Sequence, residues 1–162
     1  MDDQLKARLG EFSDLLIQWN GAMNLVSRRD IHRLQERHID DSLRLVPLLE
    51  REGALLDIGS GGGLPGVVLA IAQPQRPVVL LDRAEKKCRF LAQAATELQL
   101  ANVEVVCGAA ESLDRPGVFA YVVSRAVAPA ESVWKWAEPL LQKQGKMLHM
   151  TGEQQITQRS RA

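Results

Sequence analysis

The sequence predicts an α/β fold in which a helical N-terminal segment precedes a parallel sheet. From residue 54 onward, short apolar runs of strand length alternate with segments of helical periodicity, which is typical of parallel strands joined by helices. The first run, 54–58, leads directly into a turn with glycines at 59, 61, 62, 63 and 66. The chain has 162 residues, of which 46% are apolar, enough for one compact core. These observations together predict a Rossmann-like sheet.

The N-terminal segment, residues 1–50, is expected to form a helical cap. Apolar residues recur at helical spacing over residues 3–19, and Asn20-Gly21 is expected to end that helix. Asp30 is predicted to cap a helix from Ile31 to about Glu36. A further helix is predicted over residues 39–49, bent by Pro47.

Residues 51–152 are expected to form the α/β core. Strands are predicted at 54–58, 77–82, 103–107, 119–124 and 145–150, and helices at 64–72, 84–98 and 131–141. Right-handed crossovers bring the carboxyl ends of such strands to one edge, where these folds bind ligands. Residues 153–162 are polar, and we expect a frayed tail. Cap, core and tail are expected to form one compact unit.

The charges of the chain are balanced overall but locally clustered. The 20 basic and 20 acidic residues cancel, which is unlike a free nucleic-acid binder, although a local basic patch can still hold RNA. Two basic clusters stand out, and charge alone favours solvated helix faces over a binding surface. They are Arg28, Arg29, Arg33 and Arg37-His38, and then Arg83, Lys86, Lys87 and Arg89.

Nothing in the sequence indicates a membrane or a metal. No apolar run approaches the roughly 20 residues that a membrane-spanning helix needs, and the acidic N-terminus does not resemble a signal peptide. Cys88 and Cys107 lack metal-ligand spacing, and we expect them to be reduced core residues. The predicted location is therefore cytoplasmic.

The turn after the first strand reads Asp57-Ile58-Gly59-Ser60-Gly61-Gly62-Gly63-Leu64-Pro65-Gly66. Its glycines let the chain turn sharply and let a ligand approach the backbone. Gly61, Gly63 and Gly66 also have the spacing of the dinucleotide-binding fingerprint, G-x-G-x-x-G, which is a weak signal on its own. Asp57, however, would repel a pyrophosphate and attract a cation. S-adenosylmethionine carries a sulfonium, an ammonium and a ribose, so the turn favours this ligand over a dinucleotide or an empty turn.

Three charged residues stand at the ends of later strands. Asp82 ends the second strand, where a carboxylate can accept both ribose hydroxyls. Glu111 follows the third strand and could hold an adenine or only cap the next turn. Arg125 ends the fourth strand and could bind a substrate phosphate or pair with Asp57 or Glu111.

The segment after the fourth strand narrows the chemistry. Enzymes that methylate exocyclic amines commonly carry an Asn/Asp-Pro-Pro-aromatic motif there, whereas this chain has Ser124-Arg125-Ala126. Methylation at pyrimidine C5 needs a cysteine in the cleft, and neither cysteine is predicted to lie there. An acceptor atom with its own lone pair, such as guanine N7, fits what is left. Such a transfer needs alignment and no general base, so we assign no catalytic acid or base.

These segments together resemble the ribosomal RNA small subunit methyltransferase G family, also called glucose-inhibited division protein B. The resemblance covers about residues 5–152. Beyond the glycine turn it rests on Trp19-Asn20, Met23-Asn24-Leu25, Arg37-His38-Ile39-Asp40-Asp41-Ser42, Leu81-Asp82, Lys87-Cys88-Arg89-Phe90-Leu91 and Ser124-Arg125-Ala126. It implies a class I methyltransferase that uses S-adenosylmethionine to methylate N7 of one guanosine in 16S ribosomal RNA or the small ribosomal subunit. It implies cofactor contacts from Gly59, Leu64, Ala110, Glu111 and Arg125, with Asp82 near the ribose.

The chain departs from the family pattern in two places. Thr151-Gly152 stands where the family usually has Lys-Gly, and the C-terminal strand pair that completes the sheet is apparently missing after the fifth strand. An exposed sheet edge would favour self-association, although the sequence leaves the oligomeric state open. The alternatives are a methyltransferase for another RNA or a small molecule, or a catalytically silent adenosylmethionine-binding module.

Overall fold

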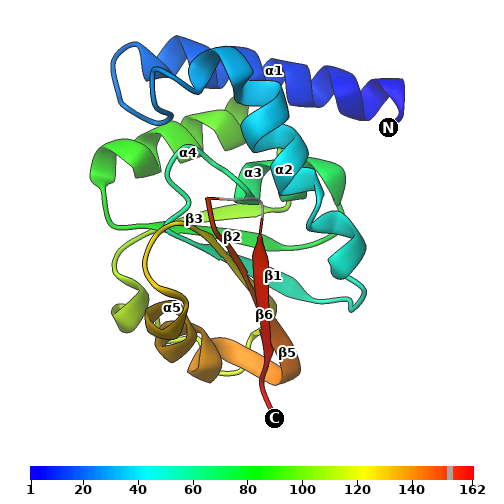
Figure 1. Ribbon diagram of the computed structural model, residues 1–162, viewed down its shortest axis with the longest axis vertical. Coiled ribbons are helices and arrows are strands. Elements are labelled where there is room, and N and C mark those ends of the chain that lie inside the picture. Colours follow the sequence, from blue (N-terminus) through cyan, green and yellow to red (C-terminus); the bar gives the residue numbers. More distant parts are fainter. Residues whose placement is uncertain (153–154) are drawn as a thin grey trace.

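Six strands form one sheet in the computed structural model, which describes residues 1–152 and 155–162 (Figure 1). The strand order is β3-β2-β1-β4-β5-β6, with β1 to β5 parallel and β6 antiparallel to β5. The strands are β1 (Ala54–Ile58), β2 (Val78–Asp82), β3 (Val103–Cys107), β4 (Phe119–Arg125), β5 (Leu141–Met150) and β6 (Ile156–Ser160). The chain reverses direction across the sheet between β1 and β4, so a ligand crevice is expected at their carboxyl ends.

Helices cover both faces of the sheet. On one face lie α3 (Gly66–Ala72) and α4 (Glu85–Glu97), with α1 (Asp3–Asn20) and α2 (Asp40–Leu43) packed outside them (Figure 1). On the other face lies α5 (Ala130–Ala137). Because both faces are covered, the central strands are buried along their length and read as continuous apolar runs. All predicted strands and the helices α1, α3, α4 and α5 are thereby confirmed, within a few residues at their ends.

The second half of the cap differs from the prediction. Instead of two regular helices, residues 31–48 form η1 (Ile31–Arg33), η2 (Gln35–Ile39), α2 and η3 (Val46–Leu48). The buried residues of this stretch, Leu34, Ile39, Leu45 and Leu49, are spaced too irregularly for one stripe on a straight helix. The chain therefore bends to bury them, and η2 widens to a π-helix between Leu34 and Ile39. Asp30 makes no capping hydrogen bond.

Arg76 fastens the junction between cap and core. Its guanidinium donates to the carbonyl oxygens of Gly53 at 2.6 Å, Arg51 at 2.9 Å and Leu49 at 3.2 Å. The same group lies 5.4 Å from the centre of the Tyr121 ring, and the Tyr121 hydroxyl accepts from the amide of Arg51. Burial lowers the pKa of Arg76, although arginine remains charged. The junction is thus bound to both β2 and β4.

The expectation of a frayed tail and a missing C-terminal strand pair was wrong. Residues 156–160 form β6, which pairs with β5 from Lys146 to Met150. A polar sequence suffices because an edge strand needs hydrogen bonds on one side only and exposes most of its side chains. Arg159 also lies 4.4 Å from the centre of the Trp134 ring and 3.1 Å from Glu131 of α5. Residues 153 and 154 lie outside the described residues.

Candidate active site

The glycine turn after β1 forms the floor of the candidate site. Gly59, Gly61 and Gly63 have positive φ angles of 70°, 54° and 86°, which L side chains rarely adopt. A Cβ atom on Gly59 would also lie 2.5 Å from a methyl carbon of Val127. The amides of Gly59 and Ser60 donate to the carbonyl oxygen of Leu81, so the turn is tied to β2.

Asp57 supports this turn from below. It is fully buried, and its Oδ2 accepts hydrogen bonds from the Ser60 hydroxyl at 2.8 Å and the Gly66 amide at 2.9 Å. Its Oδ1 is buried and has no hydrogen-bond partner among the described residues. Burial raises the pKa of Asp57 to about 7, against the opposing effect of those two hydrogen bonds. Asp57 and Gly63 both face the interior, where Gly63 packs closely against Val67 and Phe12. Both therefore shape the turn, and their contact with a cofactor stays a prediction.

A cavity of about 200 Å³ lies at the carboxyl ends of β1, β2 and β3. Asp82 lines it, with one carboxylate oxygen accepting from the Gly61 amide and the other from the Ala84 amide, both at 2.9 Å. Each oxygen keeps a second lone pair for a ligand. Gly59, Ala110 and Glu111 line the same cavity. Glu111 lies inside the short 3-10 helix η4 (Ala110–Ser112), which has no side-chain capping hydrogen bond, and its carboxylate lies 4.0 Å from Arg83.

A second cavity, of about 220 Å³, lies between the glycine turn and the cap. Gly59 borders both cavities, and this one is also lined by Ser60, Gly61, Leu64, His38 and Arg125. Leu25, Val26 and Ser27 form its cap wall, because the Asn20 side-chain oxygen accepts from the amides of Leu25 and Val26 at 2.8 Å.

Arg125 bridges the core and the cap. Its Nη2 donates to the Arg37 carbonyl at 3.2 Å and lies 3.9 Å from Asp41, while its Nη1 is buried without a hydrogen-bond partner among the described residues. The expected pairing with Asp57 or Glu111 is not what the structure shows, since Asp41 is the carboxylate beside it. Burial and the charge of Arg125 lower the pKa of His38, so this imidazole is neutral near pH 7.

The remaining candidate residues lie outside the two cavities. Arg28, Arg29, Arg33 and Arg37 are exposed on the cap, and Arg28 and Arg29 directly follow the cavity residue Ser27. Arg37 lies 3.6 Å from Asp30. Cys88 is buried as expected, but Cys107 is exposed, and neither lines these cavities. Residues 1–152 and 155–162 contain no cluster of three or more groups that could hold a metal.

Several cavity residues escaped the sequence analysis, and Val127 and Trp136 are two of them. Val127 packs on Gly59, and Trp136 of α5 forms a wall of the cavity that contains Asp82. Val127 stands out only as an exposed apolar residue in the structure. Trp136 follows Trp134 on a helix expected to be amphipathic, so nothing in the pattern separates a cavity wall from core packing.

Comparisons with known proteins decide the family. The model of a family described as rRNA small subunit methyltransferase G matches residues 5–161. The chain belongs to this family. It is a methyltransferase, and its cofactor is S-adenosylmethionine.

Individual relatives agree with this assignment. The ribosomal RNA small subunit methyltransferase G of Gluconobacter oxydans is 42% identical over 90% of this chain and 74% of its own length. That of Halorhodospira halophila is 45% identical over 94% of this chain and 72% of its own length.

Solved structures of other proteins share the fold of this chain. A putative S-adenosyl-L-methionine-dependent methyltransferase from Methanococcus maripaludis matches with a TM-score of 0.63 at 16% identity, over 76% of this chain and 61% of that one. Geranyl diphosphate C-methyltransferase from Streptomyces coelicolor matches with a TM-score of 0.61 at 17% identity, over 75% of this chain and 47% of that one. At such identities the likeness concerns the fold alone. No helix in the described ranges is long and apolar enough to cross a membrane.

Proposed function

We propose that this chain methylates N7 of a guanosine in 16S ribosomal RNA, in the small ribosomal subunit or its free RNA, in the cytoplasm. The observation that carries the proposal is the pair of cavities that meet at Gly59, in a chain of the methyltransferase G family. One cavity presents a carboxylate, Asp82, and the other a guanidinium, Arg125. These match the two polar ends of S-adenosylmethionine, its ribose hydroxyls and its amino-acid carboxylate.

The residues present fit this cofactor. Asp82 is placed to accept the ribose hydroxyls, and Ala110 and Glu111 to flank the adenine. Nη1 of Arg125 has no hydrogen-bond partner among the described residues, so it is a donor that the amino-acid carboxylate of the cofactor can satisfy. Gly59, Ser60, Gly61 and Leu64 line the passage between the two ends. The cofactor supplies an electrophilic methyl group when bound.

Guanine N7 agrees with the groups that surround the second cavity. N7 already carries a lone pair, so the protein needs to hold it in line with the methyl group and needs no base. Neither cysteine lines either of these two cavities, which speaks against a covalent route to a pyrimidine C5. His38 is the one imidazole at this cavity, and its lowered pKa keeps it uncharged beside a purine that becomes positive on methylation.

The direct test is transfer of a labelled methyl group. We expect the protein to label small ribosomal subunits or deproteinised 16S RNA, and nuclease digestion to release the label as 7-methylguanosine. Label in another RNA or in another base would favour the alternative methyltransferase. Binding of S-adenosylhomocysteine without transfer to any RNA would favour the silent binding module.

The ribose contact gives a first prediction. Asp82→Ala should weaken binding of S-adenosylhomocysteine, because charge-assisted hydrogen bonds of about 1.5–3 kcal/mol each are lost. Calorimetric titration measures the change. Glu97→Ala, on the exposed face of α4, serves as a control and should leave affinity unchanged. An Asp82→Ala protein that binds normally would remove Asp82 from the site.

The exposed arginines of the cap give a second prediction. We propose that Arg28, Arg29, Arg33 and Arg37 contact RNA phosphates around the mouth of the second cavity. Glutamine at all four positions should leave cofactor binding intact and weaken RNA binding. The slope of log affinity against log salt should flatten by about 0.7–0.9 per lost phosphate contact. The control is Lys6→Gln with Lys143→Gln, which removes two charges, one from α1 and one near the start of β5, away from the carboxyl ends of the strands. Equal RNA affinity and salt slope in both variants would mean that the arginines are only a solvated face.

A further inference from the structure

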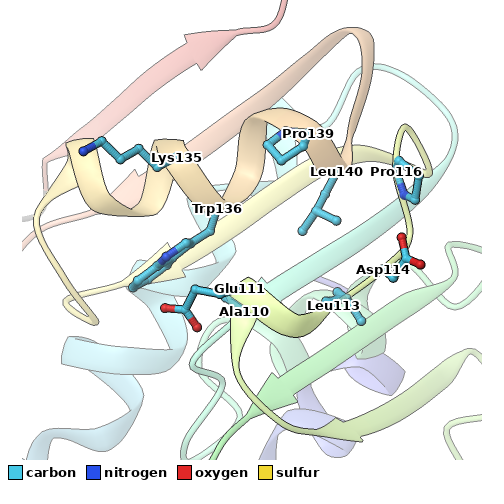
Figure 2. A pocket seen from close by; sticks show the side chains of 9 residues that line it. All are labelled: Ala110, Glu111, Leu113, Asp114, Pro116, Lys135, Trp136, Pro139 and Leu140. Carbon is cyan, nitrogen blue, oxygen red and sulfur yellow. The ribbon is translucent and has the colours of Figure 1, made fainter.

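A third cavity lies next to the cavity that contains Asp82. It has a volume of about 340 Å³ and lies between the segment that follows β3 and the end of α5 (Figure 2). Ala110, Glu111 and Trp136 line both cavities, so the two are neighbours that share one wall. The residues that line only the third cavity are Leu113, Asp114, Pro116, Lys135, Pro139 and Leu140.

Trp136 stands where the two cavities meet. Figure 2 shows its side chain reaching from α5 toward Glu111 and Ala110. The residue is half-buried, and part of it packs on the apolar core beneath α5. The shared wall is therefore made of side chains and one short turn, not of a strand that would close the passage.

The direction of the adenosine follows from the residues already assigned. The ribose is placed at Asp82, and the base extends from it toward Ala110 and Glu111. In adenine, the six-membered ring with its N6 amine lies on the side away from the glycosidic nitrogen. The N6 edge therefore points toward the residues that border the third cavity.

The walls of the third cavity suit an apolar ring. Leu140 is buried in the core beneath α5, and Leu113 packs against the same core. Pro116 and Pro139 add apolar surface, while the charged residues Asp114 and Lys135 are exposed to solvent. An apolar cavity of about 150 Å³ can hold benzene, so one aromatic ring has ample room here. The Trp136 indole can add an aromatic contact.

We propose that the third cavity is an extension of the adenosine site and that it accepts an apolar aromatic group carried on adenine N6. This inference rests on the proposed placement of the adenosine. It assigns a ligand class, N6-aryl-substituted adenosine cofactors and inhibitors, to a cavity that the methyl transfer itself does not use.

Paired titrations test the proposal. Calorimetry with S-adenosylhomocysteine and with its N6-benzyl derivative should give affinities within about tenfold of each other for the unaltered protein. Leu113→Trp fills the third cavity and should weaken the benzyl derivative at least tenfold more than the parent compound. Val118→Trp adds the same side chain at an exposed position outside the cavity and should change neither affinity. If Leu113→Trp does not fold by circular dichroism, Pro116→Trp fills the cavity from its exposed side.

The outcomes separate the two claims. Failure of S-adenosylhomocysteine to bind would overturn the proposed site and with it this extension. Normal binding of the parent compound with loss of the benzyl derivative by about 100-fold or more would overturn only the extension. Equal weakening of both ligands by the filling variant would also overturn it, because the third cavity would then not be separable from the adenine site.

Discussion

Replacing Asp57 with asparagine is expected to remove a pH dependence of stability between about pH 4 and pH 7. The pKa of Asp57 is raised from 3.8 in the unfolded chain to about 7 in the fold. Over this interval the folded protein keeps a proton that the unfolded chain has lost, so stability falls as pH rises. Three pKa units correspond to about 4 kcal/mol, all of it lost above pH 7 and all of it recovered below pH 4.

Chemical denaturation at several pH values measures this effect as a difference between two proteins. The unfolding free energy of Asp57→Asn minus that of the unaltered protein should rise by about 4 kcal/mol from pH 4 to pH 8. Contributions from His38 and His149, whose lowered pKa values act in the opposite direction, are common to both and cancel. Ser60→Ala is the control, because it keeps the carboxyl and removes a hydrogen bond that lowers its pKa. In that variant stability should start to fall at the same pH, near 4, and the fall should extend to higher pH than in the unaltered protein. Parallel curves for Asp57→Asn and the unaltered protein would contradict the assignment.

Methyl transfer by Arg125→Lys should fall by about 100-fold, the loss expected when reacting groups are misplaced by about 1 Å. Arg125 lines the second cavity, donates to the Arg37 carbonyl from Nη2, and has a buried Nη1 without a hydrogen-bond partner among the described residues. A lysine keeps the charge but has one compact ammonium, which cannot serve both positions in a fixed plane. The turnover rate should therefore drop although the charge is retained.

Single-turnover rates over a range of pH values test this prediction. The shape of the pH profile should not change, because arginine does not titrate in this range and no acid or base has been removed. Arg83→Lys is the matched control, since Arg83 is largely exposed at the rim of the other cavity and lies 4.0 Å from Glu111. It should keep nearly full activity. Full activity in Arg125→Lys would reduce Arg125 to a structural link, and a new pH dependence would argue for a base in the reaction.

The sheet was predictable because its strands and its glycine turn each leave a signal in a short stretch of sequence. A strand covered on both faces must be apolar along its whole length, as in Val78–Leu81, and a glycine turn must follow β1 where the backbone takes positive φ angles. Asp82 was predictable for the same reason, because it ends a strand at the edge where parallel strands finish. Its place at a cavity agrees with the hypothesis of a ribose contact, which remains to be measured.

The missed features depend on contacts between distant parts of the chain. The complete burial of Asp57 beneath the turn, which raises its pKa, comes from the packing of the whole fold and not from the local pattern. The polar segment 156–160 becomes a strand because β5 offers an open edge and Trp134 offers a ring for Arg159. Trp136 becomes a cavity wall only once α5 is packed beside the end of β3. None of these partners lies within reach of a local pattern.

The Arg76 junction has a consequence for how RNA enters. The three carbonyl groups that Arg76 holds, with the Arg125 contact to Arg37, attach the cap to the core at opposite ends of the sheet. We expect two such attachments to oppose a lid-like movement of the cap. The mouth of the second cavity is then expected to keep its width, so the RNA has to change its conformation to enter. A guanosine can present N7 there only by leaving its stack, since the major-groove edge of an A-form duplex is too deep and narrow for a protein wall to reach. On the proposed function, the expected substrates are unpaired or flipped-out guanosines, and a guanosine that stays stacked in a duplex is excluded by shape.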